Sequence, residues 1–173
     1  MVSFKPILIF TGAALAATVP QVYNDITVLD NNVKALTAQV EIYTGGLVSA
    51  LPQLSALSAV YESLFIGDVD TGLLPTTLLS ESDVTILINH VNETLAVDNP
   101  IAVKTLEGKK DLYKAAGLDS LLAGALQLLL AGHETFVRHA VERTAPDDLD
   151  RVKVVALVIS EALQHGIDTF QAA

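Results

Sequence analysis

Residues 20–47 read PQVYNDITVLDNNVKALTAQVEIYTGGL and carry the clearest periodicity in the chain. The apolar residues alternate between spacings of four and three, which places them on one stripe of an α-helix. They are Val22, Ile26, Leu29, Val33, Leu36, Val40, Tyr43 and Leu47. The glycine pair that follows Thr44 is typical of a helix end in a left-handed cap. The pattern predicts a first helix over residues 20–44 with its apolar stripe against a core.

Helical spacing continues beyond the glycine pair. A second helix is expected after Pro52 and should end at the turn residues Gly67–Gly72. Residues 73–79 are expected to form a loop. Ser80 then begins a string with acidic residues, which is typical of an N-cap and the first turn of a third helix.

Proline and glycine divide the second half of the chain. Asp98-Asn99-Pro100 should end the third helix and begin a fourth, which runs to Ala116 with Gly117 as its cap. Residues 118–140 predict an apolar helix, and a break at 144–148 precedes the last one. The sequence therefore predicts an all-α fold, a bundle of five or six amphipathic helices. Such a bundle can enclose an apolar cavity where small residues meet large ones.

Composition excludes several classes of function. The 173 residues include ten Lys and Arg against twenty Asp and Glu, so the formal charge is −10. A nucleic-acid binder would show a basic footprint instead. With no cysteine in the chain, disulfides, thiolate nucleophiles and cysteine-ligated metals are all excluded. The mean hydropathy of +0.47 requires a large core or a bound apolar ligand.

Residues 1–16 are interpreted as a secretory signal peptide. Lys5 precedes an apolar run over residues 7–15, and Ala14-Leu15-Ala16 supplies the small residues that a signal peptidase recognises. Residues 17–173 would then form a single helical-bundle domain, secreted and more acidic by the loss of Lys5. No transmembrane segment is expected, because the apolar stretch 118–132 is short and interrupted by polar residues.

No catalytic constellation is found, so the protein is not expected to be an enzyme or to use a cofactor. The string that starts at His133-Glu134 lacks the second histidine of a zinc motif, since Val137 occupies that position. No metal site is predicted. Asn92-Glu93-Thr94 is an N-glycosylation sequon, although helical context disfavours Asn92 as an acceptor.

The apolar stripes are either core alone or walls of a lipid site. Lys109 sits in a thin apolar stripe, where its ammonium either reaches water or meets a fatty-acid carboxylate. Small residues such as Gly124 and Gly132 either leave space or allow close helix packing. The residues that we expect to contact lipid are Leu29, Val33, Leu36, Val40, Tyr43, Tyr61, Lys109, Leu122, Leu126 and Leu129.

Two segments resemble a known family. They read VYNDITVLDNNVKALTAQVEIYTGGLVSALPQL from residue 22 and GKKDLYKAAGLDSLLAGALQLL from residue 108. They are similar to the fungal hydrophobic surface-binding protein A family, which is related to the antigenic cell-wall galactomannoproteins. The resemblance implies a small secreted helical protein, with cell-wall association in some members. It also implies binding: either adsorption to hydrophobic solids with recruitment of a cutinase-like esterase, or a long-chain fatty acid held inside the bundle.

Two hypotheses follow. In the first, the protein holds a long-chain fatty acid or similar lipid between its helices. In the second, it adsorbs to hydrophobic surfaces through exposed apolar stripes and recruits a secreted esterase through its acidic exterior. The two differ in whether the apolar surface is enclosed by the bundle or presented to solvent.

Overall fold

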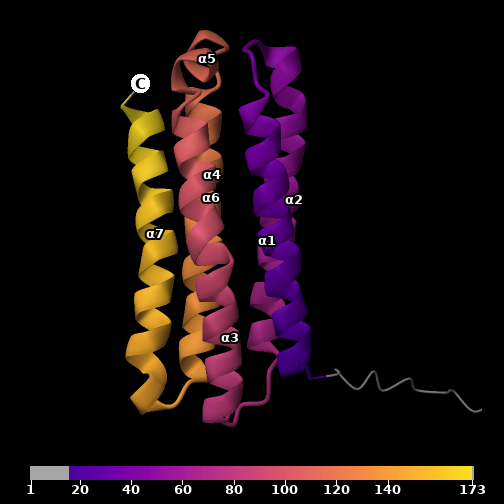
Figure 1. Cartoon of the computed structure of the whole chain (residues 1–173), viewed down its shortest axis with the longest axis vertical. Helices are drawn as coiled ribbons and strands as arrows, with labels where there is room; N and C mark the ends of the chain where they lie inside the picture. Colours follow the sequence, from indigo (N-terminus) through magenta and orange to yellow (C-terminus); the bar gives the residue numbers. More distant parts are fainter. Residues whose placement is uncertain (1–15, 173) are drawn as a thin grey trace, which may run out of the picture.

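The computed structural model describes residues 16–172, and all regular structure in that range is helical (Figure 1). A single turn of 3₁₀ helix (Pro146–Asp148) precedes the last helix. The α-helices are α1 (Val19–Glu41), α2 (Leu47–Gly72), α3 (Glu81–Glu93), α4 (Leu95–Glu107), α5 (Lys110–Ala115), α6 (Asp119–Glu142) and α7 (Leu149–Gln171). The predicted all-α fold is confirmed. The predicted signal peptide, apart from Ala16, lies outside the described residues.

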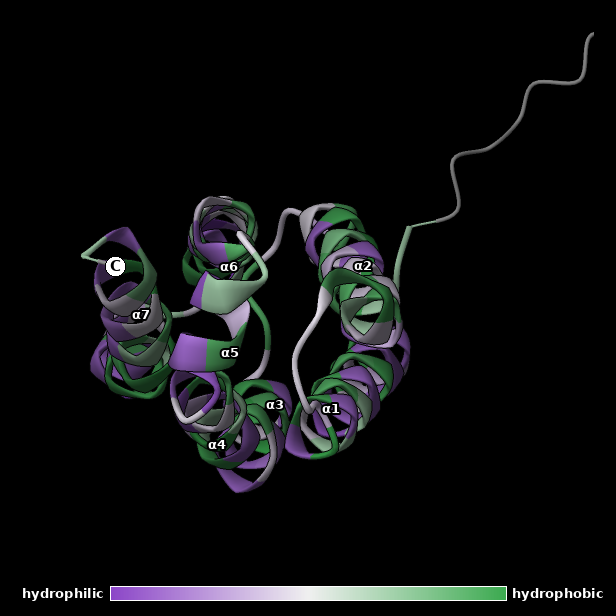
Figure 2. Cartoon of the chain, turned by 90° about the horizontal axis from the view of Figure 1, so that it is seen from above, coloured by the Kyte–Doolittle hydropathy of each residue, from purple (hydrophilic) through white to green (hydrophobic). Residues whose placement is uncertain are grey.

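The helices form five rods that surround a common interior (Figure 2). The helices α3 and α4 are separated only by Thr94 and make up one interrupted rod. Each rod packs against the next in the order α1, α2, α6, α7 and α4, and α4 closes the ring against α1. The buried face of every rod therefore contributes to one continuous hydrophobic core.

The helix ends follow the capping signals more closely than the proline signals. The Thr18 side chain caps α1, and the Ser80 hydroxyl accepts a hydrogen bond of 3.1 Å from the Asp83 N–H at the start of α3. After α1, Gly45 and Gly46 adopt φ values of 103° and 87°, which a side chain would disfavour. The residues 73–79 form the predicted loop.

Two helix boundaries that were predicted from proline are wrong. Pro52 lies inside α2 and Pro100 lies inside α4, each at the sixth residue of its helix. In α2 the carbonyl that loses its partner belongs to Val48, whose side chain is 79% exposed, so water can solvate the local backbone. The break between α3 and α4 falls instead at Thr94, with φ −121° and ψ −91°.

The predicted limits of other helices also need correction. The first helix ends at Glu41 rather than Thr44, because the turn to α2 begins at Ile42. The predicted fourth helix is interrupted at Gly108, between α4 and α5. Gly117 is the predicted cap: its φ is 69°, and the Leu118 N–H donates to the Tyr113 carbonyl over 3.0 Å.

Tight contacts join α4 to α7 in the core. Gly166 of α7 faces Val103 of α4 and Leu126 of α6. A Cβ atom on Gly166 would lie 2.8 Å from Val103 Cγ1 and 3.0 Å from Leu126 Cδ1. The three rods approach one another this closely only because residue 166 has no side chain.

Two carboxyl groups face each other between α1 and α2. Asp25 interacts with Asp70, whose Oδ2 also accepts a hydrogen bond of 2.6 Å from Gln21 Nε2. Burial, followed by the hydrogen bond with and charge repulsion from Asp70, raises the pKa of Asp25 from 3.8 to about 6. The folded protein therefore holds this proton more tightly than the unfolded chain does. Stability from the protonated pair is present below about pH 4 and is lost as the pH rises through 6.

The substitution Asp25→Asn is expected to stabilise the protein at pH 7, because it removes a charge that is partly buried and repelled by Asp70. The gain should be about 1 kcal/mol, since solvent screens part of both effects. At pH 4 the difference should vanish. Urea unfolding at both pH values measures it, with the exposed Asp150→Asn variant as the control. An equal gain at both pH values would show that the ionisation of Asp25 is not the cause.

Candidate functional site

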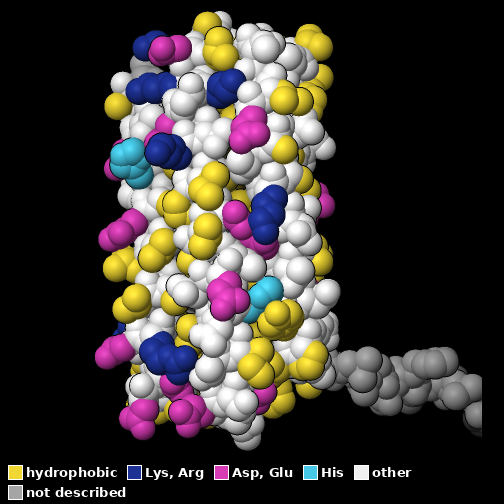
Figure 3. Space-filling view, in the orientation of Figure 1, with side chains coloured by type: hydrophobic (Ala, Val, Ile, Leu, Met, Phe, Trp, Pro, Cys, Tyr) yellow, Lys and Arg dark blue, Asp and Glu magenta, His cyan; other side chains and the backbone are white. Residues whose placement is uncertain are grey.

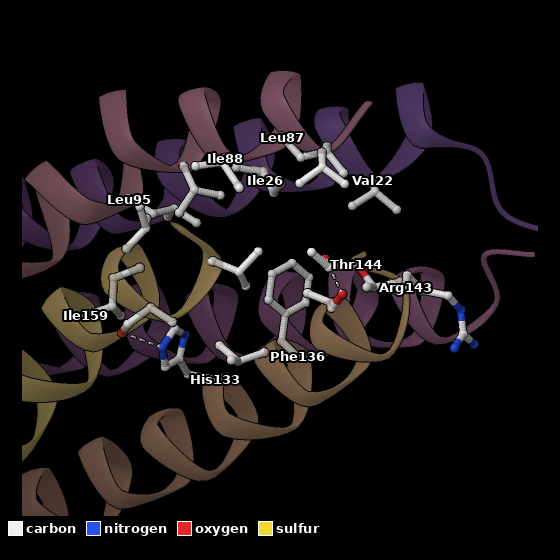
Figure 4. A pocket seen from close by; sticks show the side chains of 18 of the residues that line it. Val22, Ile26, Leu87, Ile88, Leu95, His133, Phe136, Arg143, Thr144 and Ile159 are labelled. Atoms are coloured by element: carbon white, nitrogen blue, oxygen red, sulfur yellow. Dashed lines mark hydrogen bonds between the residues drawn. The ribbon is translucent and has the colours of Figure 1, made fainter. Parts of the chain in front are cut away.

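A cavity of about 90 Å³ lies inside the half of the bundle that contains α3 (Figure 4). Its walls come from α1, α2, α3, α6 and α7, with Leu95 from the start of α4. Its apolar lining includes Val22, Ile26, Leu29, Leu64, Val84, Leu87, Ile88, Val91, Phe136, Val137, Ala140, Val152, Val155, Ala156 and Ile159. The alanines at 140 and 156 leave room between the neighbouring large side chains.

The polar side chains in the cavity wall have backbone carbonyl groups as hydrogen-bond partners. Thr71 donates its hydroxyl hydrogen to the Gly67 carbonyl over 2.7 Å, and Thr144, just beyond α6, donates to the Ala140 carbonyl over 2.8 Å. His133 is 7% exposed, and its Nε2 lies 3.1 Å from the Ala156 carbonyl oxygen. Burial lowers the pKa of His133, which keeps the imidazole neutral near pH 7. The wall is therefore apolar in character.

Arg143 is the charged residue of the wall, and its side chain extends away from the cavity (Figure 4). The guanidinium donates hydrogen bonds to the carbonyls of Gly72 and Leu74, over 3.0 and 3.4 Å. These bonds fix the loop after α2 rather than forming an anion site in the cavity. Within residues 16–172, no group of three or more His, Asp or Glu side chains is placed to hold a metal ion.

The size of the cavity limits what it holds in this conformation. Pockets for small organic ligands usually enclose about 300 Å³ or more. The space of about 90 Å³ accommodates only a few methylene groups. A long apolar ligand requires a wall to move or side chains to repack.

The structure places the predicted lipid contacts in four different regions, one of which, on the outside of the bundle between α2 and α6, contains Tyr61. Leu29 lines the cavity. Six more of the predicted contacts, on α1 and α6, are buried in the core beyond the cavity: Val33, Leu36, Val40, Leu122, Leu126 and Leu129. Tyr43 is buried at the opposite end, where its ring stacks on Tyr113 with 4.5 Å between ring centres. Lys109 lies at that end too, and its Nζ donates to the Tyr43 carbonyl over 3.1 Å.

Most of the cavity wall was missed from the sequence. Val22 and Ile26 belong to the α1 stripe. Four wall residues at helical spacing form the α3 stripe, so their inward orientation was predictable too: Val84, Leu87, Ile88 and Val91. The spacing did not indicate which inward residues leave space. That property depends on how the rods pack around Ala140 and Ala156.

A second apolar feature, the α2–α6 groove, lies on the outside of the bundle. It consists of two hollows of about 570 and 280 Å³ that share Tyr61 and Leu128. Tyr61, Phe65, Leu121 and Leu128 are 41 to 59% exposed here. On the opposite face, which carries α1, α3 and α4, charged side chains are interspersed with apolar ones (Figure 3).

The helix α6 explains the apolar character of this groove. It has 24 residues and is therefore longer than the apolar stretch 118–132, whose shortness argued against a membrane span. By length and composition alone, α6 could cross a membrane. Only 28% of its apolar window is buried within the bundle. Gly124 lines the groove, and a Cβ atom added there would have no neighbour within 4 Å, whereas a Cβ on Gly132 would touch Leu64 Cδ2 at 3.0 Å. Gly124 therefore leaves space in the groove, whereas Gly132 allows α6 to pack closely against α2.

Solved structures share this fold. The crystal structure of Afmp4p in complex with palmitic acid has a TM-score of 0.83 and 20% identity, covering 88% of this chain and 99% of that one. Ligand binding domain 2 of the Penicillium marneffei MP1 protein, complexed with multiple arachidonic acids, has a TM-score of 0.83 and 18% identity, covering 92% and 99%. Domain 1 of the same protein, also with arachidonic acids, has a TM-score of 0.80 and 20% identity, covering 88% and 99%.

The sequence itself matches one family. No curated protein matches the chain significantly. Residues 19–142, from the start of α1 to the end of α6, match the family model described as Hydrophobic surface binding protein A. The match covers more than half of the chain and includes both segments on which the resemblance was based, so the chain belongs to the hydrophobic surface binding protein A family.

Proposed function

We propose that this protein is a non-catalytic carrier that binds a long-chain fatty acid between its helices. The observation that carries this proposal is the apolar cavity between the helices, whose wall directs no charged side chain inward. Burial of methylene groups there supplies the binding free energy. The solved structures with the same fold, complexed with palmitic or arachidonic acids, support this ligand class.

The acyl chain would extend from the cavity along the bundle axis. Leu29 lies at the cavity, and further α1 and α6 residues of the same core follow it. We therefore retain Val33, Leu36, Leu122 and Leu126 as proposed wall residues for a ligand longer than the present cavity. Lys109 is engaged by a backbone carbonyl at the far end and Tyr61 lies in the outer groove, so neither belongs to this proposal.

Native mass spectrometry tests the carrier function. The protein is delipidated, incubated with palmitic acid or arachidonic acid, and measured against an unliganded sample. We expect an adduct with the mass of the added fatty acid. Absence of any adduct with either acid, from protein that remains folded, would contradict the proposal.

The α2–α6 groove favours a second candidate function, adsorption to hydrophobic surfaces. Its exposed apolar side chains are accessible without any change in the fold. An exposed apolar patch of this kind commonly marks an interaction site. We propose that an adsorbed molecule recruits a secreted cutinase-like esterase through its acidic exterior, in which case added salt should weaken the recruitment.

The double substitution Leu121→Ser and Leu128→Ser should reduce adsorption. Both leucines line the groove, and both side chains are exposed to solvent. We expect the variant to bind hydrophobic beads less than the wild type while it still forms the fatty-acid adduct. Wild-type adsorption by the variant would exclude this groove as the adsorbing face.

We also propose that the protein is secreted and carries a glycan on Asn92. The structure removes part of the objection to this sequon, because Asn92 is exposed and lies next to the last residue of α3. In a fungal secretion host, Asn92→Gln should abolish a mass increment that peptide-N-glycosidase also removes. Asn89→Gln, an exposed position on α3 outside a sequon, should leave the increment in place. Secreted wild-type protein without the increment would contradict the assignment.

A further inference from the structure

The helix α3 is the most weakly held wall of the cavity. It buries one residue fully, Val84, whereas α1, α2, α6 and α7 each bury five or more. Its other inward side chains, Leu87, Ile88 and Val91, line the cavity but are only half-buried. Figure 4 shows Leu87 and Ile88 opposite Phe136 and His133 of α6. Displacing α3 therefore exposes less buried apolar surface than displacing any other wall.

The two ends of α3 allow it to move while α4 stays in place. At its C-terminal end the helix stops at Thr94, whose φ of −121° and ψ of −91° are neither helical nor extended. Beyond Thr94, α4 is fixed to α7 by the close contact of Val103 with Gly166. At the other end, the Leu79 N–H donates to the Arg143 carbonyl over 2.8 Å, and the loop before it is mostly exposed.

Side-chain contacts close both long edges of α3. On the α1 edge, His90 stacks on Tyr23 with 3.8 Å between ring centres, and its Nε2 lies 2.8 Å from Thr27 Oγ1. On the α7 edge, Arg151 donates a hydrogen bond of 3.2 Å to Thr85 Oγ1. Tyr23 and Arg151 are both exposed, so these contacts lie at the surface and can break without unpacking the core.

We propose that α3 is a lid, and that a fatty acid reaches the cavity through the seam between α1 and α3 when His90 separates from Tyr23 and Thr27. This inference rests on the proposed carrier function and names the access route to the same cavity. The movement pivots α3 between Leu79 and Thr94 and enlarges the cavity from its present volume of about 90 Å³. Closure afterwards covers the acyl chain with the α3 stripe.

A reversible cross-link across the seam tests the lid. The chain has no cysteine, so Thr27→Cys with His90→Cys introduces the only two thiols. A short bis-methanethiosulfonate reagent joins them and is released by reductant. The uptake rate of cis-parinaric acid, a fluorescent fatty acid, is measured before and after reduction. We expect the cross-link to slow uptake by about 100-fold, because the conformational step that association requires is blocked.

A matched pair of cysteines controls for cross-linking itself. Glu107 of α4 and His165 of α7 are in direct contact away from the lid, with 2.5 Å between Oε1 and Nδ1. Cross-linked Glu107→Cys with His165→Cys should take up the probe at the wild-type rate. Unchanged uptake by the pair across the seam, or equal slowing by both pairs, would overturn the lid.

Hydrogen exchange measures the lid without a ligand. We expect the α3 amides to exchange faster than the α4 amides in the wild-type protein, because α3 opens locally. If the wild type binds no fatty acid, the proposed carrier function is wrong. Hydrogen exchange of the α3 and α4 amides then tests the lid independently. Equal protection of α3 and α4 would then overturn it.

Discussion

The substitution Ala140→Leu is expected to weaken fatty-acid binding while the protein stays folded. Ala140 lines the cavity on α6, and the three added carbon atoms would occupy most of the space of about 90 Å³. An acyl chain would then compete with a covalently attached side chain for the same volume. Overpacking costs about 1 to 3 kcal/mol, so the affinity for palmitic acid should fall by about 5- to 150-fold. Titration calorimetry with palmitic acid measures the loss.

The same change at Ala125 provides the control. Ala125 is also on α6 but lines the outer α2–α6 groove. Ala125→Leu should therefore leave the affinity for palmitic acid unchanged. If Ala125→Leu weakened binding and Ala140→Leu did not, the fatty acid would occupy the groove rather than the cavity.

The substitution Gly166→Ala is expected to cause the largest loss of stability from a single added methyl group. The new Cβ would lie 2.8 Å from Val103 Cγ1 and 3.0 Å from Leu126 Cδ1, so α4 and α7 must move apart. Inserting a methyl group into a packed core costs about 1 to 3 kcal/mol, which outweighs the gain in helix propensity. For a domain of this size the melting temperature should fall by about 2 to 4 °C per kcal/mol.

Gly124→Ala is the matched control for this prediction. Nothing lies within 4 Å of a Cβ at residue 124, so the substitution changes only the conformational entropy that the backbone loses on folding. That variant should be more stable than the wild type by about 0.5 to 1 kcal/mol. Thermal unfolding of both variants gives the comparison, and a stabilised Gly166→Ala would show that α4 and α7 are less tightly packed than their geometry indicates.

The fold class could be predicted because helical periodicity is a local property. The stripe from Val22 to Val40 is buried as its spacing predicts, and Ser80 caps α3. The proline boundaries failed for a local reason as well: at the sixth residue of a helix, the backbone group that Pro52 deprives of a partner lies close to water. Proline position alone did not reveal that exposure.

The cavity could not be predicted, because it depends on contacts between distant parts of the chain. Lys109 illustrates the difficulty: the partner of its ammonium is the carbonyl of Tyr43, 66 residues away. Ala140 and Ala156 read as ordinary core alanines in their own helices. The arrangement of the five rods in space brings both alanines to the wall of the same cavity, opposite α3.

The apolar cavity wall also has a consequence for ligand selectivity. Because Arg143 extends outward and the wall hydroxyls bond to backbone carbonyls, no charged side chain of the described wall is placed to select a carboxylate over an ester or an alcohol. Each buried methylene group contributes about 0.8 kcal/mol, so lengthening the acyl chain by two carbons raises the affinity by about 15-fold. This gain ends when the cavity can no longer expand to hold a longer chain. The protein would then select its ligands by the length of the hydrocarbon tail and not by the headgroup.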